Sequence, residues 1–376
     1  MNPIEESSAP VQWRAVENAH EIETPALLVY PERIGENLRR MIALAGDTNR
    51  LRPHLKTVKM PDVVVMLLEQ GIRRFKCATI SEAEMAADAG APDVLLASQP
   101  VGPNAGRLRS LVRKHPQTRF STIVDDPAAA EALSAEFAGE GRKLEVWLDI
   151  DCGMHRTGVP PGREAFDLHR RLGLLPGLVV AGLHVYDGHI HESDPHERAR
   201  QCEAAFAPVA ELRGELERET KGPVRVVAGG TPTFPMHARR GDVECSPGTC
   251  LLWDFGYADR FPDLDFLQAA LVLTRVVSRP APDRLCLDLG HKAIASENPH
   301  PRVRFELNDA VAVMHSEEHL VIESGRAGTY AIGNVLFGIP RHICPTVALY
   351  SEAVVIRDGR AAGRWRIPAR DRRLTI

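Results

Sequence analysis

The sequence has 376 residues, of which 44% are hydrophobic, 26% charged and 5% aromatic, a composition typical of a folded globular protein and not of a disordered chain. Its formal net charge of −4 gives no basic surface field that would gather nucleic acid or anionic lipid. No apolar run approaches the roughly 20 residues that cross a bilayer. We therefore expect small-molecule partners, with no nucleic acid and no membrane.

The start of the chain and its cysteines both predict a cytoplasmic location. The first ten residues, MNPIEESSAP, are acidic and polar, whereas a signal peptide is basic and then apolar. The seven cysteines are an odd number without a Cys-x-x-Cys pair, so we expect reduced thiols.

Short apolar runs rich in β-branched residues alternate with longer amphipathic segments between residues 25 and 255. This alternation predicts repeated βα units and a parallel sheet. Eight of nine predicted strands would close a TIM-type (β/α)8 barrel, and one belongs elsewhere. The predicted strands are 26–30, 50–55, 74–79, 94–98, 119–124, 144–150, 178–185, 224–228 and 243–245.

Two of the predicted helices have recognisable starts. Ser81 with Glu84 reads as a capping box, and Asp126 before Pro127 reads as an acidic cap with proline in the first turn.

The pattern changes after residue 255 to short strand-like runs such as ALVLTRVV, DAVAVM and TVALYSEAVVI. We predict a barrel domain over residues 25–255 and a mainly β domain over 256–376, joined by residues 1–24. The closing RDRRLTI is predicted to be a solvated tail.

Catalytic groups of a parallel barrel lie at the carboxyl ends of its strands. In RPHLKTVK, the residues Arg52, His54 and Lys56 share one face of the predicted strand 50–55. A lysine in a barrel mouth suits Schiff-base chemistry, because partial desolvation favours the uncharged nucleophile. The alternative is that Lys56 and Lys59 are ordinary surface lysines.

Two further clusters follow later strands. LDIDCGMHRTG places Arg156 among glycines, where it would bind a phenolate or carboxylate, or form a structural pair with an aspartate. AGLHVYDGHIH offers Tyr186 as a flat wall for a planar cofactor, and its histidines leave metal binding by His189 or His191 open. His184 and Asp187 lie in the same run without an assigned role.

Glycines and hydroxyls after the last two predicted barrel strands form two cradles for a phosphate. The first contains Gly230, Thr231 and Thr233, and the second is Ser246-Pro247-Gly248-Thr249. Free backbone amides and hydroxyls bind phosphate without a charged side chain, and the last strands of a TIM barrel are the usual place for such a site.

A metal site is predicted near the end of the chain. In HICPT, His342 and Cys344 share one face of an extended segment, and imidazole with thiolate favours zinc. The alternative is a buried cysteine beside a hydrogen-bonded histidine.

Taken in order, these motifs resemble the D-threonine aldolase and D-serine dehydratase family of fold-type III pyridoxal phosphate (PLP) enzymes, which have an alanine racemase-like barrel. The resemblance runs from ETPALLVYPERIGENLRRM to HICPTVAL, and RPHLKT together with HICPT is its most specific part.

The resemblance implies roles for individual residues. Lys56 would bind PLP as a Schiff base, with His54, Arg156 and Tyr186 as further catalytic candidates. Arg156 would bond the ring oxygen of the cofactor and Tyr186 would pack on its pyridine ring. Ser246 stands where related racemases place an arginine facing the pyridine nitrogen. The phosphate would be held by Gly230, Thr231, Gly248 and Thr249, and a divalent metal, Zn²⁺ or Mn²⁺, by His342 and Cys344.

The implied activity is cleavage of a D-β-hydroxy-α-amino acid to glycine and an aldehyde by a PLP- and metal-dependent lyase. The resemblance also implies a homodimer in which the β domain of each subunit contributes to the active site of the other. Alternatives are a 3-hydroxy-D-amino acid dehydratase that yields a keto acid and ammonia, an amino acid racemase and a PLP-binding protein without turnover. Outside this family, the fallback is a metal-dependent TIM-barrel hydrolase.

Overall fold

The computed structural model describes residues 12–376, which divide into two compact units. The barrel unit contains Asn37–Leu251, Arg260–Phe266 and Pro368–Ile376. The β unit contains the described residues up to Glu36 together with Leu252–Asp259 and Leu267–Ile367. The chain passes between them inside helix α1 (Pro31–Ala45) and again inside helix α9 (Phe255–Arg260).

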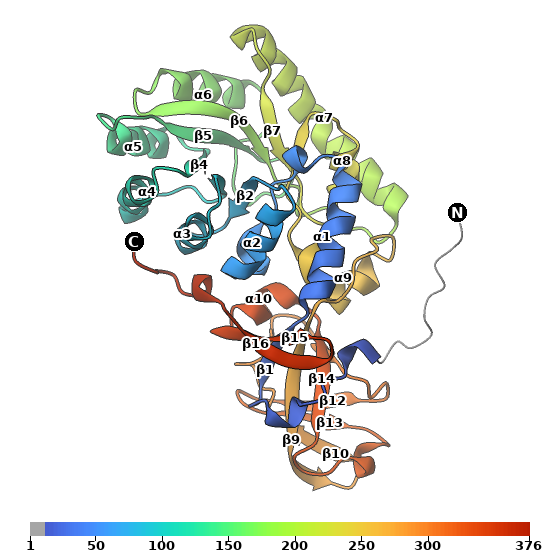
Figure 1. Ribbon diagram of the computed structural model, residues 1–376. Coiled ribbons are helices and arrows are strands. Elements are labelled where there is room, and N and C mark those ends of the chain that lie inside the picture. The colour runs from blue at the N-terminus through green and yellow to red at the C-terminus, as the bar shows by residue number, and fades with distance from the viewer. Residues whose placement is uncertain (1–11) are drawn as a thin grey trace. The chain divides into compact units, whose positions relative to one another are not determined.

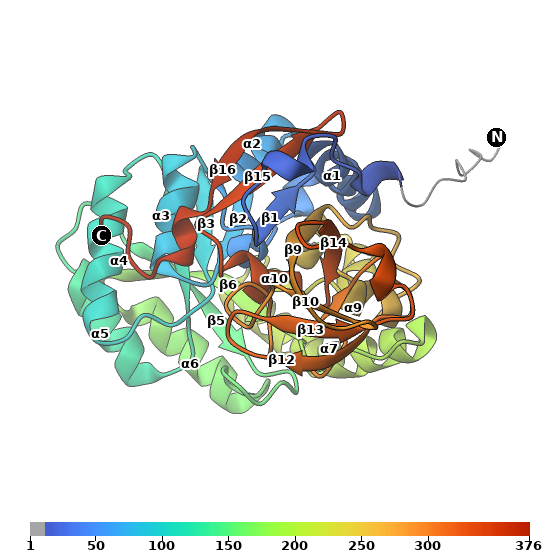
Figure 2. The same ribbon diagram turned by 90° about the horizontal axis from the view of Figure 1, so that it is seen from below.

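Seven parallel strands in sequence order form the barrel sheet, with their helices on the outside (Figure 1, Figure 2). Four of the predicted strands have the predicted limits, and the other three are one or two residues shorter than predicted. The strands are β2 (Arg74–Cys77), β3 (Asp93–Leu96), β4 (Arg119–Val124), β5 (Leu144–Ile150), β6 (Leu178–Val185), β7 (Arg225–Ala228) and β8 (Val243–Cys245).

The barrel is closed by a segment that is not a strand. Leu51 forms a parallel bridge with Cys245 of β8, and His54 forms one with Lys76 of β2. The predicted strand 50–55 is therefore wrong as a regular strand. Pro53 has no amide hydrogen to give to a ladder, and a 3-10 turn begins at Leu55. This interruption places Lys56 in a turn at the barrel mouth.

Helices follow the strands, and their first turns are capped by side chains. The cap of α3 is Thr79, whose hydroxyl accepts from Glu82 N, so the predicted box of Ser81 and Glu84 is wrong by two residues. Asp126 caps α5 as predicted. The helices between β1 and β8 that follow α1 are α2 (Pro61–Glu69), α3 (Ile80–Asp88), α4 (Pro103–Lys114), α5 (Pro127–Phe137), α6 (Arg163–Leu174), α7 (Pro195–Thr220) and α8 (Phe234–Ala238).

The β unit is built on a mixed sheet of nine strands in which β9 is central and pairs with β1, β10 and β14. The predicted strand 26–30 belongs here as β1 and lies outside the barrel sheet. The strands are β1 (Ala26–Val29), β9 (Ala270–Ala281), β10 (Arg284–Leu287), β11 (Val303–Arg304), β12 (Val311–His315), β13 (Leu320–Glu323), β14 (Val335–Pro340), β15 (Glu352–Arg357) and β16 (Arg360–Arg366).

The two ends of the described chain each pack against one of the two units, the first against the β unit and the last against the barrel unit. Val16, Ala19 and Ile22 are buried in the core of the β unit against β9 residues such as Leu271. In the barrel unit, Arg107 of α4 donates to the backbone oxygen of Ile376 at 2.8 Å. The closing segment is therefore docked through its last residue, while five of its seven residues are exposed, as expected for the predicted solvated tail.

Two further features bear on the predictions. The start of TVALY lies in a short helix, α10 (Ile343–Val347), where the sequence pattern suggested a strand. All seven cysteines are unpaired, and none of the helices in residues 12–376 combines the length and the apolar character needed to span a bilayer.

Candidate functional site

Three basic side chains surround the ring of Tyr186, which directly follows β6. Arg156 Cζ lies 5.0 Å from the ring centroid, Lys56 Nζ 5.8 Å and Lys76 Nζ 5.7 Å. The predicted catalytic residues Lys56, Arg156 and Tyr186 are therefore brought together. Lys76, at the end of β2, was not predicted, although a lysine inside the run RFKC was a visible signal.

None of these three basic side chains forms an ion pair within residues 12–376. A basic cluster without acidic partners suits an anionic ligand, because the ligand supplies the missing counter-charge. The aspartate pair considered for Arg156 does not form. Asp151 accepts from the amides of Gly153 and His155, each at 2.9 Å, and Asp149 is engaged by other partners.

The loop that carries Arg156 can be formed only with glycine at position 158. Gly158 has φ +98°, and a Cβ there would lie 2.6 Å from the amide nitrogen of Asp151. The loop is tied to the barrel by Asp149, whose carboxylate accepts from Thr157 Oγ1 at 2.8 Å and pairs with His184 Nδ1 at 2.6 Å. These contacts position Arg156 beside Tyr186.

Arg52, His54 and Lys56 were predicted to share one face of a strand, but Arg52 and His54 lie in different surroundings. His54 Nδ1 accepts from the backbone amide of Lys56 at 3.3 Å, and burial lowers the pKa of His54 well below its ordinary value. Arg52 is fully buried and forms ion pairs with Asp93 at 2.6 Å and Glu244 at 2.8 Å. Arg52 therefore belongs to the barrel interior.

The two predicted cradles converge on one hydroxyl. Thr231 Oγ1 accepts from the amides of Gly248 at 3.1 Å and Thr249 at 3.2 Å. A Cβ at position 248 would lie 2.9 Å from the carbonyl oxygen of His54, so only glycine lets this loop pass so close. A phosphate oxygen is a stronger acceptor for such amides than a hydroxyl. The cradle residues therefore fit a phosphate group.

Two more observations agree with a ring-and-phosphate ligand. The hydroxyl of Ser246 is buried and has no hydrogen-bond partner within the described chain, so a ring nitrogen would satisfy it. Gly230 lies against the ring of Tyr186, with a virtual Cβ 3.2 Å from Tyr186 Cε2. The residues present thus fit PLP.

A buried polar network that the sequence did not predict lies behind Tyr186. Asp187 accepts from Thr233 Oγ1 at 2.8 Å and from His237 Nε2 at 2.8 Å. Cys202 completes a group of three potential metal ligands whose ligand atoms lie within 4.8 Å of one another. Burial raises the pKa of Cys202 to about 12, and its thiol also contacts Asp187 at 3.8 Å and His237 Nε2 at 3.6 Å.

The remaining histidines of HVYDGHIH do not form a metal site with one another. His189 packs its ring on Gly153, where a Cβ would lie 2.9 Å from His189 Nε2. The backbone oxygen of His191 accepts from Arg260 at 2.7 Å.

The predicted metal ligands lie in the β unit beside a carboxylate that the sequence did not reveal. His342 Nδ1 lies 2.5 Å from Glu297 Oε1, and the thiol of Cys344 also bonds His342. Burial lowers the pKa of His342, but Cys344, Glu297 and Asp254 outweigh burial and raise it to about 9. With Nδ1 held by the carboxylate, Nε2 remains for a metal, which is the usual arrangement of metal-binding histidines.

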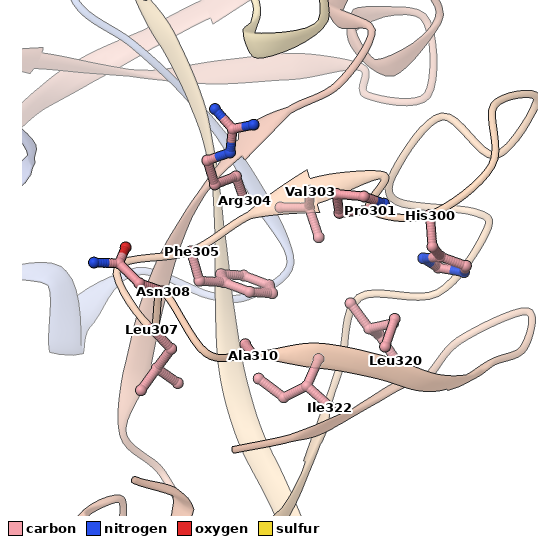
Figure 3. Close-up of a pocket in the computed structure, with 11 residues that line it drawn as sticks. His300, Pro301, Val303, Arg304, Phe305, Leu307, Asn308, Ala310, Leu320 and Ile322 are labelled. Atoms are coloured by element: carbon pink, nitrogen blue, oxygen red, sulfur yellow. The ribbon is translucent and has the colours of Figure 1, made fainter. Parts of the chain in front are cut away.

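A separate cavity of about 210 Å³ lies in the β unit (Figure 3). Its walls are mainly apolar side chains such as Phe305, Leu320 and Ile322, with His300 at one end. Arg304 points away from it and pairs with Asp259. It contains none of the predicted site residues, and its lining offers no lysine for a Schiff base.

Comparison with known proteins identifies the family. The profile described as alanine racemase, N-terminal domain, matches residues 29–253, and that described as putative serine dehydratase domain matches residues 269–356. The chain belongs to the alanine racemase-like family. The predicted barrel with a mainly β C-terminal domain and the resemblance to this family are confirmed.

Relatives within the family cover nearly the whole chain. A D-threonine aldolase of Arthrobacter sp is 30% identical over 355 residues, 93% of each chain. A 3-hydroxy-D-aspartate aldolase of Paracoccus denitrificans (strain Pd 1222) is 28% identical and covers 93% of this chain and 92% of its own. The crystal structure of D-threonine aldolase from Filomicrobium marinum has a TM-score of 0.84 at 28% identity, covering 93% and 96%.

A more distant neighbour shares the fold. A D-threo-3-hydroxyaspartate dehydratase has a TM-score of 0.81 at 23% identity, covering 93% of this chain and 98% of its own. Its solved forms include a histidine-to-alanine mutant and, two positions further along, a cysteine-to-alanine mutant described as metal-free.

Proposed function

We propose that this protein is a PLP- and divalent-metal-dependent lyase that cleaves a D-β-hydroxy-α-amino acid to glycine and an aldehyde. The observation that carries the proposal is the group of Lys56 and Arg156 at the ring of Tyr186, basic and without acidic partners in residues 12–376. The aldolases among the relatives, aligned over 93% of the chain, support the choice of reaction and of D-configured substrates.

The proposed roles of the barrel residues follow from their placement. Lys56 bonds the cofactor covalently, and the amides of Gly248 and Thr249 with the hydroxyl of Thr231 bind its phosphate. Arg156 bonds the ring oxygen and Tyr186 packs on the ring. PLP supplies an electron sink for the bond that breaks at the α-carbon.

Several smaller roles complete the proposed site. Gly230 admits the ring at close range, Ser246 faces the ring nitrogen, and His54 holds the turn that carries Lys56 through its Nδ1. Because Ser246 is neutral, it does not supply the positive charge that an arginine would place at this nitrogen.

The proposed metal residues are His342 and Cys344, with Glu297 fixing the imidazole. Their donor set suits Zn²⁺, and Mn²⁺ is the alternative. Such an ion would lower the pKa of a substrate hydroxyl and fix its direction.

Dehydration is the second candidate, because one observation favours it. The His-x-Cys spacing of His342 and Cys344 equals that of the two alanine mutants of the dehydratase, one of them metal-free. In that reaction a metal held by His342 and Cys344 would supply Lewis-acid assistance to the departing β-hydroxyl, and the products would be a keto acid and ammonia.

Three further statements stay predictions from the sequence. These are a homodimer with shared active sites, a cytoplasmic location, and the limits of the two domains. The barrel domain is predicted to span residues 25–255, and the mainly β domain residues 256–376 together with residues 1–24.

The test is an absorbance spectrum of the purified protein with PLP, followed by D-threonine and D-serine with Zn²⁺ or Mn²⁺. We expect a band near about 410–430 nm that is absent in Lys56→Ala and present in Lys143→Ala, an exposed control. Aldehyde with glycine supports the lyase, and a keto acid with ammonia supports the dehydratase. A protein that gains no band with PLP contradicts both.

A further inference from the structure

Lys76 is a lysine of the barrel interior to which the proposed reaction has not yet given a role. It is the third residue of β2, is only 2% exposed, and pairs through its backbone with His54, two residues before Lys56. Its amine lies 5.7 Å from the centroid of the Tyr186 ring, close to the 5.8 Å of Lys56. Both amines therefore lie near the same aromatic ring.

The carboxylates nearest to Lys76 are already engaged. Asp149 binds His184 and Thr157, and Asp187 binds His237 and Thr233. Within residues 12–376, Lys76 forms neither an ion pair nor a side-chain hydrogen bond. A buried lysine without a counter-charge is costly in its charged form.

The surroundings therefore favour the uncharged amine. Burial is the main cause that lowers the pKa of Lys76 to about 7, and the charge of Lys56 is the next, acting against the raising effects of Asp187 and Asp149. The charged and titratable groups facing Lys76 come from three parts of the barrel, and they are Arg52, His54, Lys56, Asp149, Tyr186, His184 and Asp187. Lys76 therefore loses its proton more readily than an exposed lysine does.

We propose that Lys76 accepts the proton that an amino acid substrate loses when its nitrogen takes the place of Lys56 on the cofactor. This inference rests on the proposed function. The substrate arrives as an ammonium ion, and only its neutral amine can form the new nitrogen–carbon bond. The bond from Lys56 to the same carbon breaks, Lys56 leaves as a neutral amine, and the released proton resides on Lys76. When the product leaves, Lys76 returns the proton to the departing amine.

Two histidines close to this position are less suited to the task. His54 Nδ1 already accepts from the amide of Lys56, and burial keeps the pKa of the ring well below its ordinary value. His184 uses Nδ1 to bind Asp149, and its pKa is also lowered by burial. Lys76 is the strongest base of the three in its surroundings.

The experiment follows the visible band of the PLP-loaded enzyme in a stopped-flow instrument after mixing with glycine. Glycine has no β-hydroxyl group to cleave, so the rate of the spectral change reports the exchange alone. In the unmodified enzyme we expect this rate to fall about tenfold per pH unit below pH 7. In Lys76→Met we expect a rate about 100-fold lower, and the plot of rate against pH should not change slope near pH 7.

Two further variants separate a proton acceptor from a structural residue. Lys76→Arg keeps a cation but cannot accept a proton, so it should not restore the rate. Lys143→Met, an exposed lysine before β5, should behave as the unmodified enzyme. Thermal unfolding and PLP content verify that each variant is folded and loaded.

A Lys76→Met enzyme with the rate of the unmodified enzyme and the same change of slope near pH 7 overturns the inference. The inference is also overturned if the exchange rate of the unmodified enzyme stays constant from pH 6 to 8, and this measurement needs no variant. A protein that never gains a visible band contradicts the proposed function instead, so the two failures are distinguishable.

Discussion

His237 Nε2 donates a hydrogen bond to the carboxylate of Asp187 at 2.8 Å, and this bond joins the loop after β6 to the helix after β7. Burial raises the pKa of Asp187, but His237 and Thr233 outweigh burial and keep it below the ordinary value. The carboxylate is thus charged, and it fixes Tyr186 on one side and the first phosphate cradle on the other.

Asp187→Asn is expected to weaken PLP binding about tenfold, because a charge-assisted hydrogen bond contributes about 1.5–3 kcal/mol. The measurement is the dissociation constant of PLP from absorbance titration of the apo-protein. Asp194→Asn, which alters only the exposed cap of α7, serves as the control. Equal affinities in the two variants would show that the network does not organise the cradle.

Arg52→Met is expected to lower the free energy of unfolding by about 3–5 kcal/mol. The substitution leaves the buried carboxylates of Asp93 and Glu244 without their shared partner. Urea unfolding measures the loss. Arg113→Met breaks an exposed pair with Glu140 and should have no measurable effect. Equal stability of the two variants would contradict the role of Arg52 in the barrel interior.

Stability at acid pH should depend on the same three residues. Burial raises the pKa values of Asp93 and Glu244, but Arg52, together with Arg119 at Asp93 and Arg225 at Glu244, lowers both. A carboxyl with a lowered pKa contributes stability above its unfolded pKa of about 4, and this is lost as pH falls through the folded pKa. Urea unfolding between pH 3 and 7 should therefore show the unmodified protein weakening below about pH 4.

Arg52→Met should weaken this dependence relative to the unmodified protein. Without Arg52, only Arg119 at Asp93 and Arg225 at Glu244 still oppose burial, so the two pKa values lie closer to those of the unfolded chain. The difference in stability between the two proteins should therefore become smaller as the pH falls. A difference between the two proteins that stays constant from pH 3 to 7 would rule out this explanation.

Glu297→Ala is expected to weaken Zn²⁺ binding about 10- to 100-fold, because Glu297 orients the imidazole of His342. Competition with a chromophoric chelator gives the affinity. Glu297→Gln, which can still accept from Nδ1, should lose less. Glu317→Ala removes an exposed carboxylate of the same unit and should leave the affinity unchanged. Zn²⁺ binding that is insensitive to Glu297 would place the metal elsewhere.

The parallel strands of the barrel were predictable, because each is a short run rich in apolar and β-branched residues between turn residues. The predicted limits of β4, β5, β6 and β8 are those of the structure. The irregular form of the segment 50–55 was not predictable, because its sequence pattern resembles a strand while Pro53 prevents regular pairing. The pattern of β1 was equally strand-like, and only tertiary pairing with β9 assigns it to the β unit.

The candidate site was predictable where a motif carries the chemistry, as for Lys56, Arg156 and Tyr186. Residues that act through a neighbour were missed. Glu297 meets His342 across 45 positions of sequence, and no local pattern marks that pair. Lys76 was visible as a lysine in an apolar strand, but its burial and its lack of an acidic partner depend on the closed barrel.

The docked C-terminus has a practical consequence for recombinant work. Lys114 Nζ lies 2.7 Å from Glu84 and 2.6 Å from the hydroxyl of Thr375, and Arg107 holds the last carbonyl group. An affinity tag fused after Ile376 would continue the chain from this anchored position on α3 and α4. For the variants above, a tag placed ahead of residue 1 avoids disturbing those contacts.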